Sequence, residues 1–208
     1  MYEDAKERVL QASLDLMSNG FVRNTGSSGN VSLRADDDAI VITPSHVRYD
    51  TMETDDLVVI DTDGAVVESP AGYDPSSETS THLLVHDAAA GDAVVHSHPM
   101  TAVSLAQELD EIPPVYLGQA YFVGGAVPAV DYVQTGSEEM GETISGVLSE
   151  SPAVVIRHHG LFAVGDDLDE AIERTFAVEE NAEIYFKADR VGEPTPMDPA
   201  DVEAADQG

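Results

Sequence analysis

Residues 93–99 have the sequence AVVHSHP. A short run of small and β-branched apolar residues of this kind predicts a buried strand, and Pro99 fits the first position of a following short helix. Because residues two apart on a strand point to the same side, the His96 and His98 side chains should lie roughly 7 Å apart on one face of a sheet. Two imidazoles placed in this way can converge on one ion.

A metal centre needs further ligands from elsewhere in the chain. A catalytic zinc ion takes about three protein ligands and keeps one position open. The best source of the third is the pair His158-His159, which follows the apolar run 153–156 and so lies at a strand end, where functional residues gather. The ordinary alternative is that these histidines are polar groups satisfied near a core, and an isolated His-x-His does not exclude it.

A second pair of histidines offers a rival site. His82 and His86 are four residues apart on an expected helix and therefore share a face, with Glu78 one turn earlier. A zinc-protease helix carries Glu directly after its first His, whereas here Leu83 follows His82. The pattern therefore favours His96 and His98 over this pair.

Outward from these motifs, the sequence alternates between strand and helix patterns. Helices are expected over residues 2–18, 75–90, 137–148 and 168–190. Strands are expected over 31–34, 39–43, 57–60, 65–67, 93–98, 153–157 and 161–164, with one more near residue 129. Hairpin-length connections mixed with helices predict α/β layering around a largely antiparallel sheet, although the order of the strands cannot be read from the sequence.

Length and composition predict one folded domain. The chain has 208 residues, which is enough to bury one substantial core, and we assign residues 1–191 to that domain and 192–208 to an acidic, proline-containing tail. Cysteine is absent, so any metal site must use histidine and carboxylate. The N-terminus lacks an apolar signal core, and no apolar run could span a membrane, which predicts a cytoplasmic protein.

The charge balance restricts the partners. There are 40 acidic against 9 basic residues, a formal net charge of −31. Coulomb repulsion then opposes binding to nucleic acid and to anionic membranes, so neither is expected as a partner. The carboxylates are interspersed with apolar runs, and this pattern indicates a folded protein adapted to high salt, where counterions screen the repulsion.

Three short segments rich in glycine, serine and threonine predict an anion site. The loop 26–30 (GSSGN) offers backbone N–H groups and small hydroxyls, which suit a phosphate in a chain that has only two lysines. Segments 43–45 (TPS) and 75–77 (PSS) repeat this composition, and Ser76 or Ser77 is expected to cap the helix that follows. The partial positive charge of that helix N-terminus also favours an anion.

Together these motifs resemble the class II aldolase/adducin family. They are SGNVS (28–32), ITPS (42–45), PSSE (75–78), VHSH (95–98) and HHG (158–160), which occur in family order over roughly residues 5 to 190. The resemblance implies a three-layer α/β/α subunit with a mainly antiparallel sheet, assembled as a homotetramer with active sites at subunit interfaces. It also implies an enzyme that cleaves a ketose 1-phosphate, such as fuculose 1-phosphate, to dihydroxyacetone phosphate and an aldehyde.

The resemblance also assigns roles to residues. His96, His98 and His159 match the ligands of a zinc ion, or of another divalent metal, that stabilises the enediolate. Glu78 matches the acid/base, and a tyrosine after an Ile-Pro turn is matched by Tyr116 with a one-residue offset, or by Tyr121. The phosphate positions are matched by Ser27, Asn30, Ser45, Ser76 and Ser77.

Some features depart from the family pattern or leave the activity open. His46 stands where relatives usually have glycine, which changes one wall of the phosphate pocket. Other family activities are a sugar-phosphate 4-epimerase and a methylthioribulose-1-phosphate dehydratase. Epimerases typically carry aspartate at the position of Glu78, so Glu78 favours the aldolase. A non-catalytic, adducin-like interaction domain would lack the metal histidines.

Overall fold

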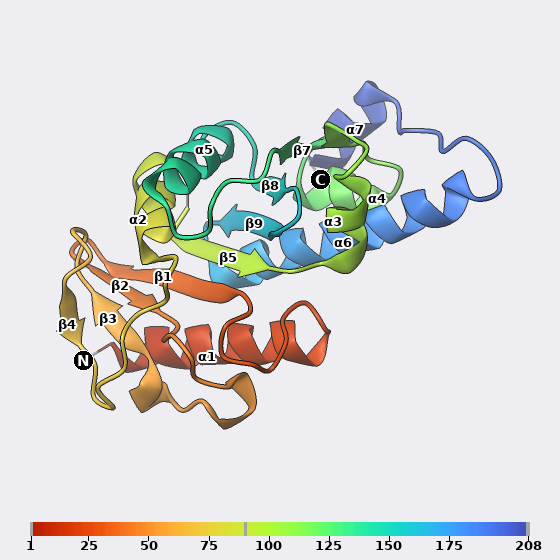
Figure 1. Ribbon diagram of the computed structural model, residues 1–208. Helices are drawn as coiled ribbons and strands as arrows, with labels where there is room; N and C mark the ends of the chain where they lie inside the picture. Colours follow the sequence, from red (N-terminus) through yellow and green to blue (C-terminus); the bar gives the residue numbers. More distant parts are fainter. Residues whose placement is uncertain (1, 90, 207–208) are drawn as a thin grey trace.

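The computed structural model describes residues 2–89 and 91–206. Within these residues, nine strands form one sheet with helices on both faces (Figure 1). The strands are β1 (Asn30–Asp36), β2 (Ala39–Ile42), β3 (Val58–Ile60), β4 (Val66–Glu68), β5 (Ala93–Ser97), β6 (Glu111–Ile112), β7 (Val127–Val130), β8 (Ala153–Ile156) and β9 (Gly160–Gly165). The helices are α1 (Glu3–Ser18), α2 (Thr79–Ala88), α3 (Met100–Leu105), α4 (Leu117–Phe122), α5 (Glu138–Leu148), α6 (Leu168–Asp189) and α7 (Pro199–Asp206), with 3₁₀ turns η1 (Tyr49–Thr51) and η2 (Thr54–Asp56).

The sheet is mainly antiparallel, as predicted. Its strand order is β4-β3-β2-β1-β5-β9-β8-β7-β6, and β7 with β8 is the parallel pair among the described strands. The strand β5 lies between β1 and β9. The register pairs His96 of β5 with Asn30 on one side and with Phe162 on the other. The histidine motif is therefore at the middle of the sheet.

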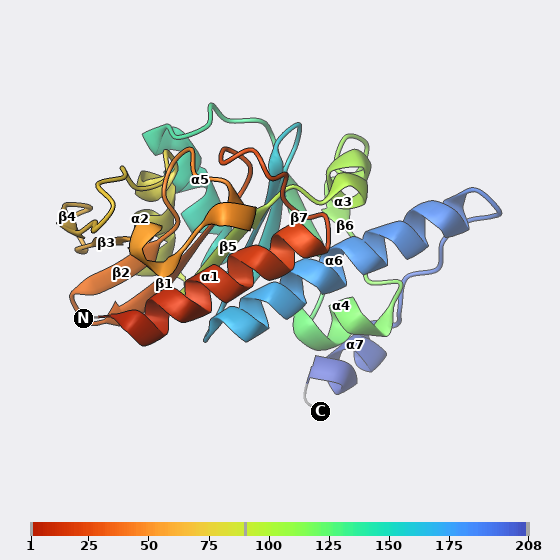
Figure 2. The ribbon, with the colours of Figure 1, turned by 90° about the horizontal axis from the view of Figure 1, so that it is seen from below.

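Helices form a layer on each face of the sheet. The long helices α1 and α6 contact each other and cover one face, which Figure 2 shows from the helix side. On the opposite face α2 packs against α5, and both contact the sheet (Figure 1). Separate groups of buried aliphatic residues fill the two faces. This is the predicted three-layer α/β/α fold. Among the described helices, none is both long and apolar enough to cross a bilayer.

The helix before the histidine strand begins later than expected. It starts at Thr79, and the N-cap position is taken by Glu78 instead of Ser76 or Ser77. Its expected end near Ala90 lies outside the described residues, and α2 ends at Ala88. Because of the later start, Glu78 is at the N-terminus of the helix, next to the sheet.

The C-terminal segment contains more structure than the sequence pattern predicts. Helix α7 packs on α4, and Val202 in α7 is buried. The backbone N–H of Met197 donates to the carbonyl of Pro114, which ties the segment to the loop before α4. Helix α7 and Met197 therefore lie against α4 and the loop before it, where the sequence pattern predicts an acidic, proline-containing tail.

Candidate active site

Three histidines converge at the end of β5. His96 and His98 come from this strand and the residues directly after it, and His159 comes from the turn between β8 and β9. One ligand nitrogen from each of the three lies within 4.8 Å of the others, and the Nε2 atoms of His96 and His98 are 3.1 Å apart. Among the described residues this is the group of histidine and acidic side chains that could hold a metal ion.

Hydrogen bonds orient the rings of the two strand histidines. The Nδ1 atom of His96 donates to the carbonyl of Leu161 at 2.9 Å, which leaves Nε2 as the free lone pair. The His98 Nδ1 atom lies 3.0 Å from the hydroxyl of Ser28, which also accepts from the backbone N–H of Arg23. The ring of Phe162 stacks on His96 with centroids 4.2 Å apart. Both rings are thus held with Nε2 directed into the cluster.

The histidines are suited to bind a metal because they are neutral. Burial lowers the pKa of His98 to about 4, and it lowers the pKa values of His96 and His159 as well. A neutral imidazole offers a lone pair, as metal ligation requires. Two unprotonated nitrogens directed at each other at 3.1 Å repel unless a proton or a cation lies between them. The donor set therefore fits a divalent cation.

A glycine allows the third histidine to approach. A Cβ atom at Gly160 would lie 2.4 Å from the carbonyl oxygen of Ser97, 2.7 Å from the His98 ring and 2.8 Å from the His96 ring. Real Cβ atoms do not approach so closely. The small residue after His159 is therefore required for the β9 backbone to pack against His96 and His98.

Glu78 lies against the histidine cluster. One carboxylate oxygen is 3.5 Å from the Nε2 atom of His96, and the other is 3.5 Å from the Nε2 atom of His159. The side chain is buried, and Oε1 has no hydrogen-bond partner. Asn30 donates to Oε2 at 2.6 Å. A buried carboxylate next to a metal can move a proton between itself and a bound substrate.

The three expected phosphate segments come together in one place. The backbone N–H of His46 donates to the carbonyl of Gly26, and that of Ser76 donates to the carbonyl of Thr43. A Cβ atom at Gly26 would lie 2.6 Å from the backbone of His46, so this close approach of the two loops requires glycine. His46 itself has φ +63°, a backbone conformation that glycine adopts without strain.

The predicted phosphate residues differ in exposure. Ser27 and Ser77 are exposed, whereas Ser76 and Asn30 are buried. The Ser45 hydroxyl donates to the carbonyl of Pro75. The Asn30 amide is committed to Glu78 and to His82, although one of its two Nδ2 hydrogens remains for another acceptor.

The candidate tyrosines lie away from the cluster. Tyr116 is the N-cap residue of α4 and Tyr121 lies within this helix, which packs on α6 and α7. Both side chains are exposed, and within the described residues no hydrogen bond or ring contact joins either one to the three histidines. One subunit therefore does not bring the predicted tyrosine to the metal ligands.

Sequence reasoning did not find two residues that support the site. Ser28 was recognised as part of the glycine-rich loop but not as the partner of His98, and Ser32 was recognised only as part of a motif. The alternation of small polar with apolar residues in SGNVS (28–32) was the available signal, because alternate residues of a strand point to one face.

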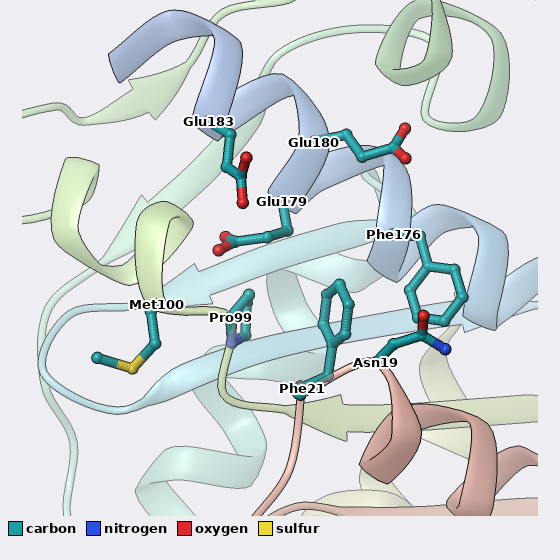
Figure 3. Close-up of a pocket in the computed structure, with 9 residues that line it drawn as sticks. Asn19, Phe21, Pro99, Met100, Phe176, Glu179, Glu180 and Glu183 are labelled. Atoms are coloured by element: carbon teal, nitrogen blue, oxygen red, sulfur yellow. The ribbon is translucent and has the colours of Figure 1, made fainter. Parts of the chain in front are cut away.

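A hollow lies next to Pro99 and Met100, which follow the histidine strand in the chain (Figure 3). It has a volume of about 360 Å³, and its lining contains none of the three histidines. The carboxylates of Glu179, Glu180 and Glu183 project from α6 above the rings of Phe21 and Phe176. Glu179 accepts the N–H groups of the first turn of α3. An acidic lining repels phosphate, so this hollow is not the sugar-phosphate pocket.

The fold is an α/β protein with a mainly antiparallel, helix-covered sheet, and three histidines that could hold a metal ion lie with a carboxylate next to its central strand β5. Comparison with protein families then identifies the family of the chain. The model of the class II aldolase and adducin N-terminal domain matches residues 7–186, so the chain belongs to this family.

Relatives with two different activities resemble the chain. The L-ribulose-5-phosphate 4-epimerase UlaF of Salmonella paratyphi C is 37% identical over 197 residues, covering 88% of this chain and 84% of that protein. The L-fuculose phosphate aldolase of Haemophilus influenzae is 31% identical over 195 residues, covering 93% and 88%. A solved L-fuculose 1-phosphate aldolase superposes with a TM-score of 0.89 at 27% identity, covering 98% and 95% of the two chains. The L-fuculose-1-phosphate aldolase of Thermus thermophilus gives 0.79 at 27% identity, covering 92% and 98%.

Proposed function

We propose that this chain is a zinc-dependent aldolase that cleaves a ketose 1-phosphate, of the fuculose 1-phosphate type, to dihydroxyacetone phosphate and an aldehyde. The observation that carries the proposal is the position of Glu78, whose carboxylate lies 3.5 Å from two of the three histidines. His96, His98 and His159 would hold the ion. When bound, a divalent zinc ion supplies Lewis-acid polarisation of the substrate carbonyl and neutralises developing negative charge.

Other residues of the chain would transfer the proton and bind the phosphate. The C3–C4 bond of the ketose breaks, its electron pair stays on C3, and the C4 hydroxyl loses its proton as the aldehyde forms. Glu78 delivers a proton to C3, and in the reverse direction the same carboxylate removes it. The serines at 27, 45, 76 and 77, together with Asn30, bind the phosphate through hydroxyl, amide and backbone N–H groups.

The group that takes the proton of the C4 hydroxyl during cleavage, and returns it to the aldehyde oxygen in the reverse direction, is assigned to a neighbouring subunit. Tyr116 and Tyr121 are exposed on α4 and do not contact the histidines of their own chain. We propose a homotetramer in which one of them, with Tyr116 preferred, reaches the site of the adjacent copy. The net charge of −31 supports a cytoplasm rich in salt as the place where this assembly works.

An epimerase is the second candidate. A 4-epimerase of ribulose 5-phosphate breaks and remakes the same kind of carbon–carbon bond, and the Salmonella relative with this name is 37% identical. Glu78 instead of aspartate favours the aldolase. The dehydratase of the same family and a non-catalytic interaction domain are weaker candidates, and the metal histidines argue against the latter.

One assay separates the two leading candidates. Purified zinc-loaded protein in high-salt buffer would be given fuculose 1-phosphate and, separately, L-ribulose 5-phosphate. Release of dihydroxyacetone phosphate from the first, with no change at C4 of the second, is the expected result. Epimerisation of the second without release from the first would replace the aldolase by the epimerase, and turnover of neither would overturn both.

A further inference from the structure

A buried line of hydrogen bonds leads from Glu78 away from the metal ligands. Asn30 Nδ2 lies 2.6 Å from Glu78 Oε2, and Asn30 Oδ1 lies 2.5 Å from His82 Nε2. The other ring nitrogen of His82 is 2.6 Å from the Ser32 hydroxyl, which in turn is 2.8 Å from His86 Nε2. All five residues are buried between α2 and β1.

The donor and the acceptor of each hydrogen bond in this line follow from the Glu78 carboxylate at its end. The Asn30 NH₂ group donates to the Glu78 carboxylate, so the Asn30 carbonyl faces His82 and accepts from it. His82 then carries its proton on Nε2, and its Nδ1 accepts from Ser32. The Ser32 hydroxyl, having donated, accepts from the Nε2–H of His86. Each residue in the line therefore donates a hydrogen bond to its neighbour on the Glu78 side.

These hydrogen bonds also argue against a metal site at His82 and His86. The facing nitrogens of His82 and His86 both meet the single hydroxyl of Ser32, so they are already satisfied. Burial lowers the pKa values of both histidines to about 3, and both are neutral at ordinary pH. Two neutral, hydrogen-bonded rings that connect to a carboxylate through Asn30 can orient that carboxylate.

We propose that His82 is a positioning residue, which fixes the amide of Asn30 and thereby aims the carboxylate of Glu78. An asparagine amide that loses its carbonyl partner can rotate by half a turn, and its oxygen would then face the carboxylate and repel it. The inference rests on the proposed role of Glu78 in proton transfer. It adds a residue in α2 that touches neither metal ligand nor substrate.

Two substitutions of the same residue test the inference. In His82→Gln the side-chain nitrogen reaches about the place of Nε2 and can still donate to Asn30. In His82→Asn the amide reaches only the place of Nδ1, so the bond to Ser32 can form but the bond to Asn30 is lost. Loss of an orienting partner typically lowers activity about 10- to 100-fold. We expect His82→Asn to lower kcat by at least about 10-fold with nearly unchanged KM and metal content, and His82→Gln to recover most of kcat.

Equal loss of kcat in the two variants, or a change in KM alone, would overturn the proposal. A measurement on the unmodified protein covers the case in which a variant fails to fold. Nitrogen-15 NMR of the histidine rings should show His82 as the neutral form protonated at Nε2, and protonation at Nδ1 would also overturn it. If the unmodified protein turns over neither sugar phosphate, the proposed function fails, while the ring NMR still decides the direction of the hydrogen-bond line.

Discussion

The carboxylate of Glu78 lies 3.5 Å from the Nε2 atom of His96, although the two residues come from different elements of the fold. Glu78 stands at the N-terminus of α2, and His96 stands on β5. The short distance places a carboxylate, a group that can exchange protons, next to the atom that is proposed to bind the metal.

Replacement of Glu78 by glutamine should separate proton transfer from metal binding. The variant Glu78→Gln keeps the shape of the side chain but cannot exchange the proton, so cleavage should fall by roughly 100-fold or more. Metal content should stay at the wild-type level because the three histidines remain. Glu139→Gln, on the exposed start of α5, is the control and should retain activity. Near wild-type cleavage by Glu78→Gln would show that Glu78 does not transfer the proton.

The histidine cluster should bind about one zinc ion per chain, as a site with three protein ligands does. Elemental analysis should find this ion in the wild type and lose it in His96→Ala. The control His158→Asn changes a histidine next to a ligand, but one that is exposed and has φ +62°, a conformation that asparagine tolerates. Full zinc occupancy in His96→Ala would show that the metal binds elsewhere.

Addition of one methyl group at Gly160 should damage the metal site without removing a ligand. The new Cβ would lie 2.4 Å from the Ser97 carbonyl oxygen, so the strand or the rings must shift. We expect Gly160→Ala to weaken zinc binding by about 10-fold or more in a chelator competition. Gly146→Ala is the matched control, because nothing lies within 4 Å of that Cβ and the site is helical. It should raise the free energy of unfolding by about 0.5–1 kcal/mol. Equal zinc affinities would contradict the steric role of Gly160.

The buried histidines should make the metal-free protein less stable in acid. The pKa of His86 is about 3 in the folded state, below its ordinary value of 6.5. The unfolded chain therefore takes up the proton first as pH falls, and stability is lost from about pH 6.5 down to about pH 3. His86→Gln should flatten this dependence by up to about 1.4 kcal/mol per pH unit. Denaturant titrations of both proteins at several pH values measure the difference, in which the carboxylates common to both cancel. Parallel curves would mean that His86 is not held neutral.

Low salt should loosen the fold and any tetramer. The net charge of −31 makes each subunit repel itself and its neighbours when counterions are removed. Sedimentation and activity would be followed as potassium chloride is lowered at fixed pH, and the tetramer should dissociate as activity falls. An active tetramer that persists at low ionic strength would contradict the adaptation to high salt.

Local patterns in the sequence predicted most of the elements. The strand that contains His96, the strands expected over 57–60 and 65–67 and the helix expected over 2–18 were all readable, because backbone stereochemistry fixes the periods of strand and helix. The strand β6 and the short helices α4 and α7 were missed. They carry few apolar residues in a regular period, and tertiary contacts decide them: β6 pairs with β7, and α4 packs on α6 and α7.

The sequence itself predicted that His96 and His98 lie together, because alternate residues of an extended segment share a face. In the structure β5 ends at Ser97, and His98, directly after it, still lies with its Nε2 atom 3.1 Å from that of His96. The resemblance to a family added the role of Glu78 and chose His159 from the pair His158-His159. Only the tertiary structure decided the strand order, the contact of Glu78 with two histidines, and the line from Glu78 through Asn30 to His82. Asn30 and His82 are 52 residues apart in the chain, and their hydrogen bond forms only when α2 packs on β1. Such contacts depend on how whole helices and strands pack against each other, and this packing cannot be read from the local periodicity of the sequence.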